Sequence, residues 1–330
     1  MKPVLVIGSN SFSGAYFISS LLDKSYEVIA VSRSAEQIKP LLPYRWNDQS
    51  YSKLQFHQLD INNDLEKIIA LVKKHKIEYV FNFAAQSMVG QSWITPEDWF
   101  ITNTVSTIKL HDKLRNIDHL TRYIHISTPE VYGNCSGIIT ENTQYNPSTP
   151  YAVSRAAADM SLATFYNAYN FPVVFTRAAN VYGEGQQLYR IIPRTILFIL
   201  LNKKLALHGG GNSTRSFIHM QDVSDATLKI ALNGVNGEIY HISTDEMITV
   251  RSLVEKICSM MSFNFHELCE ITDERLGKDN AYTLSSNKIK QQLNWHDEVS
   301  LENGISRTIN WIKNNIDELK NTHFDYIHKK

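Results

Sequence analysis

Residues 3–22 read PVLVIGSNSFSGAYFISSLL, and the class of fold follows from this stretch. Residues 3–7 form a continuous apolar and β-branched run, which is typical of a parallel strand buried on both faces. A turn from Gly8 to Gly14 follows, and then a helical run from Ala15 to Leu22. A strand, a glycine turn and a helix in this order predict a site where backbone N–H groups and a helix N-terminus receive a pyrophosphate. The alternative is a βα turn that binds no ligand.

The second predicted strand, residues 27–31, bears on the choice of dinucleotide. It ends at Ser32 and Arg33, with no acidic residue at the position where an NAD site usually binds the adenosine ribose. An arginine there accommodates a 2′-phosphate, so the sequence favours NADP over NAD. Arg33 stacked on the adenine of NAD is the alternative.

Further strands alternate with helical segments along the chain. Apolar runs lead to Asp60 and Ile61, to Ala84 and Ala85, and later to Arg177. This alternation predicts an α/β fold, a doubly wound parallel (Rossmann) sheet with a smaller C-terminal α/β domain. We place the first domain at residues 1–183 with about 217–245, and the second at 184–216 and 246–330. The polar tail after residue 316 is predicted to be partly disordered.

Composition excludes several kinds of protein. The chain has 330 residues, a formal net charge of +0 and no long run of Lys or Arg, so neither nucleic acid nor a membrane is expected as a partner. Its three cysteines are scattered, which predicts neither a disulfide framework nor a metal site. No apolar run approaches the roughly 20 residues of a membrane helix, and no signal peptide is recognised. A cytoplasmic protein is expected.

The segment from Ile126 to Asp159 holds the predicted catalytic groups. A buried strand ends in hydroxyl and carboxyl groups at Thr128 and Glu130, and a later helix carries Tyr151 and Arg155. Residues four apart share one face of a helix, so the Arg155 guanidinium is expected to lower the pKa of the Tyr151 phenol. Such a phenol is a general base, and the neighbouring hydroxyl and carboxylate suit a small polyol. A surface turn followed by an ordinary Ala-rich helix is the alternative.

These motifs resemble the extended short-chain dehydrogenase/reductase family, in particular its nucleotide-sugar 4,6-dehydratases. The family pattern is Ser-Thr-Asp-Glu-Val-Tyr-Gly followed by Pro-Tyr-x-x-Ser-Lys-Ala-x-x-Asp. Here the first part reads STPEVYG (residues 127–133) and the second PYAVSRAAAD (residues 150–159). The chain departs from the pattern at Pro129, in place of an acid, and at Arg155, in place of a lysine. The resemblance covers nearly the whole chain.

The resemblance implies a role for each matching residue. Tyr151, Arg155, Thr128 and Glu130 would be catalytic. A nicotinamide dinucleotide would be bound by Gly8, Asn10, Ser11, Phe12, Ser13, Gly14, Ser32, Arg33, Asp60, Ile61, Ala84, Ala85, Tyr151 and Arg155. A nucleotide-sugar would be bound by Gln86, Ser87, Asn180, Arg215 and Arg275. The helix carrying Tyr151 and the one carrying Asn103 would pair across the axis of a homodimer.

Three functions remain open at this stage. The first is a nucleoside-diphosphate-hexose 4,6-dehydratase, with Glu130 as the base at C5. The second is a UDP-glucuronate decarboxylase or a 4-epimerase, although a plain epimerase needs no base at C5. The third is a nucleotide-sugar binding protein without turnover, suggested by Pro129 and Arg155, because arginine and lysine are not equivalent at such a site.

Overall fold

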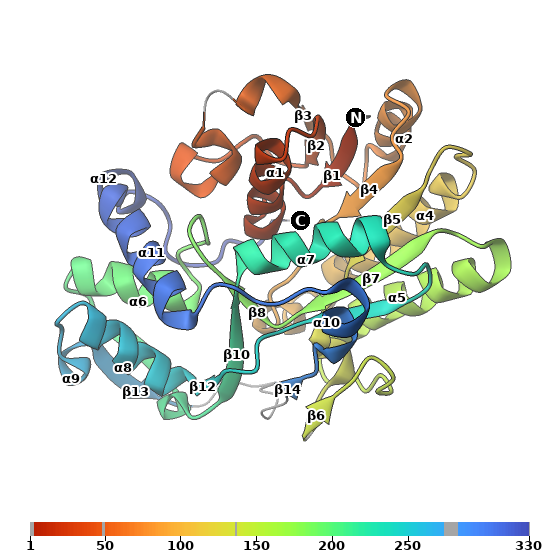
Figure 1. The fold of residues 1–330 in the computed structure, drawn as a ribbon. Coiled ribbons are helices and arrows are strands. Elements are labelled where there is room, and N and C mark those ends of the chain that lie inside the picture. Colours follow the sequence, from red (N-terminus) through yellow and green to blue (C-terminus); the bar gives the residue numbers. More distant parts are fainter. Residues whose placement is uncertain (1–2, 48–49, 136, 274–282, 330) are drawn as a thin grey trace.

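The computed structural model describes residues 3–47, 50–135, 137–273 and 283–329. Within these residues a seven-stranded parallel sheet has the order β11-β7-β5-β4-β1-β2-β3 (Figure 1). The strands run outward from β1 in one direction and then, starting at β4, in the other, so the predicted doubly wound fold is confirmed. The strands are β1 (Val4–Ile7), β2 (Val28–Ser32), β3 (Leu54–Gln58), β4 (Tyr79–Asn82), β5 (Arg122–Ile126), β7 (Val173–Ala178) and β11 (Ile239–Ile242).

Helices cover both faces of this sheet, which explains why a central strand such as β1 is apolar on both sides. On β1, Val4 and Val6 pack into one apolar core, whereas Leu5 and Ile7 pack into another. The first core includes α1 (Phe12–Asp23) and α7 (Met220–Asn233), and the second includes α2 (Leu65–Lys74), α4 (Thr107–Leu114) and α5 (Pro150–Tyr169). Before α4 the chain forms α3 (Pro96–Trp99) and a π-helical segment, η5 (Phe100–Ser106).

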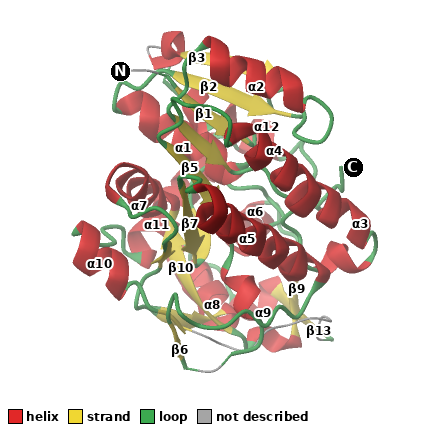
Figure 2. Cartoon of the chain, turned by 90° about the vertical axis from the view of Figure 1, so that its right-hand side faces the viewer, coloured by secondary structure: helices red, strands yellow, loops and turns green. Residues whose placement is uncertain are grey.

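A second lobe lies beside the carboxyl edge of the sheet (Figure 2). It has its own apolar core, which includes Leu197, Leu253 and Ile305. We propose that the domain boundary follows this core, with residues 184–216 and 246–330 in the second domain. The strands of this lobe are β9 (Leu205–His208), β12 (Met247–Thr249) and β13 (Cys269–Thr272), together with β8 (Asn180–Tyr182), which precedes the proposed boundary, and β10 (Thr214–His219), which crosses it. Its helices are α6 (Ile191–Leu200), α8 (Val250–Met260), α9 (Phe265–Leu268), α11 (Leu301–Asn314) and α12 (Ile316–Leu319).

Smaller elements complete the chain. Strands β6 (Ile138–Ile139) and β14 (Thr283–Leu284) pair in parallel, and α10 (Asn287–Leu293) packs against α7 and β11. None of the helices in the described ranges is long and apolar enough to cross a membrane.

Candidate active site

Two predicted catalytic residues follow β5 at the carboxyl edge of the sheet. Thr128 begins the short 3-10 helix η6 (Pro129–Tyr132), and its hydroxyl accepts a hydrogen bond from the Glu130 N–H at 3.3 Å. Pro129 occupies the first position of this helix, where a main-chain N–H would have no acceptor within the helix, so proline costs no hydrogen bond. The local sequence thus fixes the backbone of Glu130 beside Thr128.

Tyr151 reaches the same place from α5. Thr149 caps this helix by accepting a hydrogen bond from the Ala152 N–H at 3.2 Å, so Tyr151 lies in the first helical turn. The Tyr151 side chain is hydrogen bonded to Thr128, and the charge of Glu130 acts on its phenol. The structure therefore brings Tyr151, Thr128 and Glu130 together from two separate segments.

The expectation that Arg155 lowers the pKa of Tyr151 is wrong as a net result. Tyr151 is buried, and burial is the largest influence on its phenol, whose pKa is raised. Arg155 and the hydrogen bond with Thr128 favour the ionised form, but they do not overcome burial. The negative charge of Glu130 adds to the rise. Arg155 thus limits the increase instead of producing a lowered pKa.

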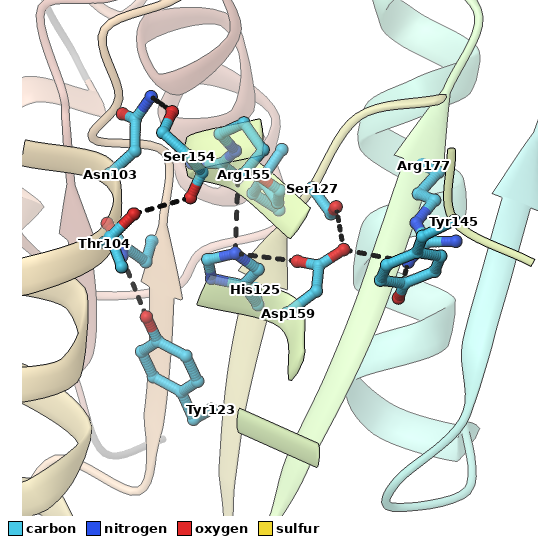
Figure 3. A network of polar contacts seen from close by, with 12 residues as sticks. Asn103, Thr104, Tyr123, His125, Ser127, Tyr145, Ser154, Arg155, Asp159 and Arg177 are labelled. Atoms are coloured by element: carbon cyan, nitrogen blue, oxygen red, sulfur yellow. Dashed lines mark hydrogen bonds and ion pairs between the residues drawn. The ribbon is translucent and has the colours of Figure 1, made fainter. Parts of the chain in front are cut away.

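Arg155 is anchored to the end of β5. It lies one helical turn after Tyr151 and is only 2% exposed. Its Nη2 donates to the main-chain carbonyl of Ile126 and lies 3.3 Å from Nε2 of His125 (Figure 3). This arginine, in the position of the family lysine, is therefore held by β5, and its contact with a cofactor remains a proposal.

Next to Arg155 lies a buried network of charged and polar side chains, drawn in Figure 3. Asp159 of α5 forms an ion pair with Arg177 of β7 at 2.8 Å, and neither side chain is exposed. Ser127 donates to the same carboxylate at 2.5 Å. Nε2 of His125 lies 3.3 Å from Oδ1 of Asp159, so this ring nitrogen has Asp159 and Arg155 as alternative partners. The network ties α5 to β5 and β7.

The charges in this network stabilise one another. Burial would raise the pKa of Asp159, but Arg177 and His125 hold it well below its usual value. The pKa of His125 is lowered, chiefly because the ring is buried. Sequence reasoning assigned no role to His125, Asp159 or Arg177. A signal existed, because Tyr151, Arg155 and Asp159 follow one another at intervals of four residues and therefore share one helix face.

Asn103 links the catalytic helix to the exit of β4. Its Oδ1 accepts a hydrogen bond from the Gln86 N–H at 2.8 Å, and its Nδ2 donates to the Gln86 carbonyl at 3.0 Å and to Ser154 Oγ at 2.9 Å. Asn103 lies in η5 and is fully buried. It thus acts as a brace between two parts of the candidate site.

The Gly8–Gly14 turn has the shape that a close-lying dinucleotide needs. Gly8 has a φ of 88°, and a Cβ on it would lie 2.6 Å from the Ala84 nitrogen. A Cβ on Gly14 would lie 2.3 Å from the Gly8 oxygen. Ser11, at the middle glycine position, caps α1 by accepting from the Gly14 N–H at 3.1 Å and donating to the Gly8 carbonyl at 2.7 Å. Ser11 therefore builds the turn, and the turn fits a pyrophosphate.

The remaining turn residues lie at the start of α1 or hold its neighbours. Phe12 is buried at the first position of α1, and Ser13 follows it, half-buried. Asn10 is buried, and its Nδ2 donates to the carbonyls of Ser34 and Ala35 at 2.8 and 2.9 Å. The Asn10 side chain thus joins the loop after β1 to the loop after β2.

The other predicted cofactor residues all lie at strand exits. Ser32 ends β2, and the carbonyl of Arg33 accepts a hydrogen bond from Gln58 at 3.2 Å. Asp60 follows β3, and its carboxylate accepts hydrogen bonds within its own loop, from Asn62 and Asn63. Ile61 is buried, whereas Ala84 and Ala85 follow β4 and are half-buried.

The predicted substrate residues fall into two groups. Gln86, which is buried, and Ser87, which is exposed, follow β4. Asn180 begins β8, and Arg215 lies on the neighbouring β10, two residues before Phe217, which pairs with Asn180. The second group thus belongs to one small sheet of the second lobe. Arg275 lies outside the described residues.

Comparison with known proteins places this geometry in a family. The family model for GDP-mannose 4,6 dehydratase matches residues 5–308. The chain is 32% identical to the dTDP-D-glucose 4,6-dehydratase of Bos taurus over 97% of this chain and 91% of that protein.

Solved structures show the same likeness. The dTDP-glucose 4,6-dehydratase DesIV of Streptomyces venezuelae, solved with NAD bound, superposes with a TM-score of 0.86 at 27% identity, covering 96% of this chain and 98% of that one. The UDP-glucose 4-epimerase of Thermotoga maritima, solved with UDP-glucose, gives a TM-score of 0.86 at 25% identity, with 95% and 99% covered. The resemblance expected from the sequence is confirmed, and the chain belongs to the GDP-mannose 4,6-dehydratase family.

Proposed function

We propose that this chain is a nicotinamide-dependent nucleoside-diphosphate-hexose 4,6-dehydratase that forms a 4-keto-6-deoxy sugar. The observation that carries the proposal is the convergence of Tyr151, Thr128 and Glu130 at the carboxyl edge of the sheet. Oxidation at C4 needs a group that accepts a hydroxyl proton, and elimination needs a second group near C5. The Thr128 hydroxyl contacts both the Tyr151 side chain and the Glu130 main chain, so two residues suited to proton transfer lie at one site.

Tyr151 and Thr128 serve the first step. The ionised oxygen of Tyr151, stabilised by its contact with Thr128, accepts the proton of the sugar 4-hydroxyl and becomes a neutral phenol. Arg155, anchored on β5, adds a positive charge that favours the ionised phenol against burial. A nicotinamide dinucleotide bound at the Gly8–Gly14 turn would supply the hydride chemistry of the cycle, with acceptance from C4 and return to C6.

Glu130 serves the elimination. The 4-keto group acidifies the C5 hydrogen, and the half-buried carboxylate of Glu130 removes it. Pro129 cannot donate a proton to the C6 hydroxyl, so the proton that Glu130 has taken from C5 leaves with that hydroxyl as water. One carboxyl group thus replaces the acid and base pair of the family pattern.

The dinucleotide is held by the Gly8–Gly14 turn and by the exits of β2, β3 and β4. NAD is bound in the solved DesIV structure, so NAD is the first dinucleotide to test. The case for NADP rests on Arg33 and on the lack of an acid directly after β2. Glu36, the first acid after β2, pairs with Arg45. The substrate would be a nucleotide-sugar held by Ser87 and Asn180, with Arg215 on its diphosphate.

A homodimer completes the proposal. Exposed apolar side chains lie on α5 at Val153 and Met160 and on η5 at Ile101 and Val105. Helices α5 and η5 pack against each other, so these side chains belong to neighbouring helices. Light scattering of the native chain and of Met160→Glu tests whether a second copy covers them.

The decisive experiment uses Glu130, because a 4-epimerase has no task for a base at C5. The native chain is incubated with NAD and, separately, with dTDP-, UDP-, GDP- and CDP-hexoses, and mass spectrometry follows loss of one water. Glu130→Gln keeps the shape of the side chain but removes the base. It should still form reduced nicotinamide, seen by absorbance, yet exchange little C5 hydrogen with solvent deuterium.

The same measurements separate the alternatives. Tyr151→Phe should neither reduce the nicotinamide nor exchange hydrogen. A native rate of 4-keto-6-deoxy product from Glu130→Gln would contradict the assignment of Glu130. Epimerised sugar without loss of water from the native chain would favour the epimerase.

A further inference from the structure

The last residues of the chain run back from the second lobe to the sheet. After α12 the chain runs back to the lobe that contains the large sheet and ends beside α3 (Figure 2). We call residues 324–329 the C-terminal strap. In the second lobe, Asp325 pairs with Arg194 of α6 at 3.0 Å, and the Tyr326 ring meets the edge of Tyr189 with 5.6 Å between ring centroids.

At its end the strap binds the lobe that contains the large sheet. The His328 ring stacks on Trp99 of α3 at 4.9 Å, with an interplanar angle of 9°, and its Nε2 lies 2.7 Å from Oδ2 of Asp98. Gln86 donates through Nε2 to the carbonyl of Lys329 at 2.6 Å. The strap therefore bridges the two lobes.

The path of the strap crosses the cofactor edge of the sheet. Ser34 follows β2 and Gln86 follows β4, and these two strands flank β1. Lys329 contacts both sides of this edge, because its carbonyl binds Gln86 and its Nζ lies 3.5 Å from the Ser34 hydroxyl. In a doubly wound sheet a dinucleotide lies across this edge. The strap thus spans the edge of the sheet across which a dinucleotide would lie.

The strap also contacts Gln86, one of the residues predicted to bind the sugar. Nε2 of Gln86 binds the Lys329 carbonyl, and its Oε1 lies 3.5 Å from the Tyr326 hydroxyl. While the strap is closed, it therefore engages one N–H and the oxygen of the Gln86 amide, which has a second N–H for another partner. Between its anchors the strap is open to solvent, since Asp325 and Ile327 are exposed, and it adds no strand or helix to either lobe.

We propose that the C-terminal strap is a gate over the cofactor and sugar cleft, which opens for a ligand to pass and closes to retain the dinucleotide. This inference rests on the proposed function for its purpose. A reaction that removes and returns a hydride within one cycle fails if the reduced cofactor escapes between the two steps. A strap anchored on both lobes slows that escape without contacting the reacting atoms.

The test is the rate of NAD exchange. Protein loaded with labelled NAD is mixed with excess unlabelled NAD, and loss of label is followed in the native chain, in a chain ending at Thr322 and in His328→Ala. The variant His323→Ala is the matched control, because it removes an exposed histidine of the same tail. We expect label to leave about tenfold faster from the truncated chain, because one well-formed hydrogen bond changes a rate by about that factor. His328→Ala should exchange several-fold faster and His323→Ala at the native rate.

An unchanged or slower exchange rate in the truncated chain, with its melting temperature retained, would overturn the gate. If the truncated chain does not fold, His328→Ala decides alone, and an unchanged rate in that variant rejects the proposal. The assay needs NAD binding but no turnover. Strap-dependent exchange without product from any nucleotide-sugar would contradict the dehydratase and leave the gate standing.

Discussion

The glycine turn and the buried network behind Tyr151 are built in opposite ways. The turn is assembled from residues close in sequence, since Ser11 bonds Gly8 and Gly14, each three residues away. The network joins distant residues, since Asp159 of α5 meets Arg177 of β7 and Ser127 beyond β5, 32 positions away. One region depends on backbone shape and the other on the pairing of buried charges.

The two regions are therefore sensitive to different kinds of substitution. A turn made of main-chain groups tolerates many side chains but not an added Cβ at a close approach. A network of buried charges tolerates no change of sign, because the partner that remains is left without compensation. Substitutions in the network should therefore affect folding first, whereas substitutions in the turn should affect the ligand as well.

Asp159→Asn should give the largest effect. It removes the carboxylate that Arg177 and His125 face in a site without solvent, and we expect a loss of about 3–5 kcal/mol in the free energy of unfolding. Asp112→Asn is the control, because its pair with Arg115 is exposed and its removal should cost less than about 1 kcal/mol. Urea unfolding at neutral pH measures both, and equal losses would erase the distinction between the regions.

Gly14→Ala should be next. The new Cβ would meet the Gly8 oxygen at 2.3 Å, so the turn must shift, at a cost of about 1–3 kcal/mol. We expect NAD affinity to fall by at least about tenfold, measured by calorimetry. Gly90→Ala provides a matched control, because nothing lies within 4 Å of its Cβ. Native affinity in Gly14→Ala would show that the turn is more adaptable than its contacts suggest.

Arg155→Met should have a smaller effect, visible in the pH profile. Burial raises the pKa of Tyr151 and Arg155 opposes that rise, so removing the charge should raise the pKa further. The rate should then climb at a higher pH, and turnover at neutral pH should fall about tenfold. Arg155→Lys keeps the charge and should retain much of the rate. An unchanged profile in the methionine variant would remove Arg155 from the mechanism.

Arg33→Ala tests the residue that directly follows β2 and should give the smallest change, seen in dinucleotide affinity. If Arg33 meets a 2′-phosphate, NADP binding should weaken by a few-fold and NAD binding should hardly change. Nucleotide released from denatured protein provides a second reading, since NADP recovered without added cofactor would agree with that role. Recovery of NAD alone would reject it.

The two regions also differ in how far sequence could predict them. The turn and the Tyr151 helix follow from local spacing, so their residues were identified with their correct neighbours. The direction of the Tyr151 pKa shift could not be predicted from spacing, because the burial of the phenol depends on the packing of the whole site. Nor could spacing pair His125 with Asp159, which lie on different elements.

The polar tail after residue 316 shows even more clearly that local sequence patterns do not predict contacts between distant residues. Its polar composition predicts partial disorder, yet Lys329 bonds to Gln86, 243 positions earlier in the chain. Single side-chain contacts between distant segments leave no periodic pattern, so propensity and hydrophobic spacing carry no trace of them.

The strap has a practical consequence for producing the protein. Residues appended to the C-terminus would begin close to Gln86 and Ser34, at the exits of β4 and β2. A purification tag or a fluorescent fusion at that end would disturb the contacts of the strap or restrict the access of ligands to the strand exits beside it. Such a tag is expected to alter the measured rates by itself. The opposite end of the chain precedes β1, so it is the better place for a tag, and comparing the two fusions would reveal the effect without any mutation.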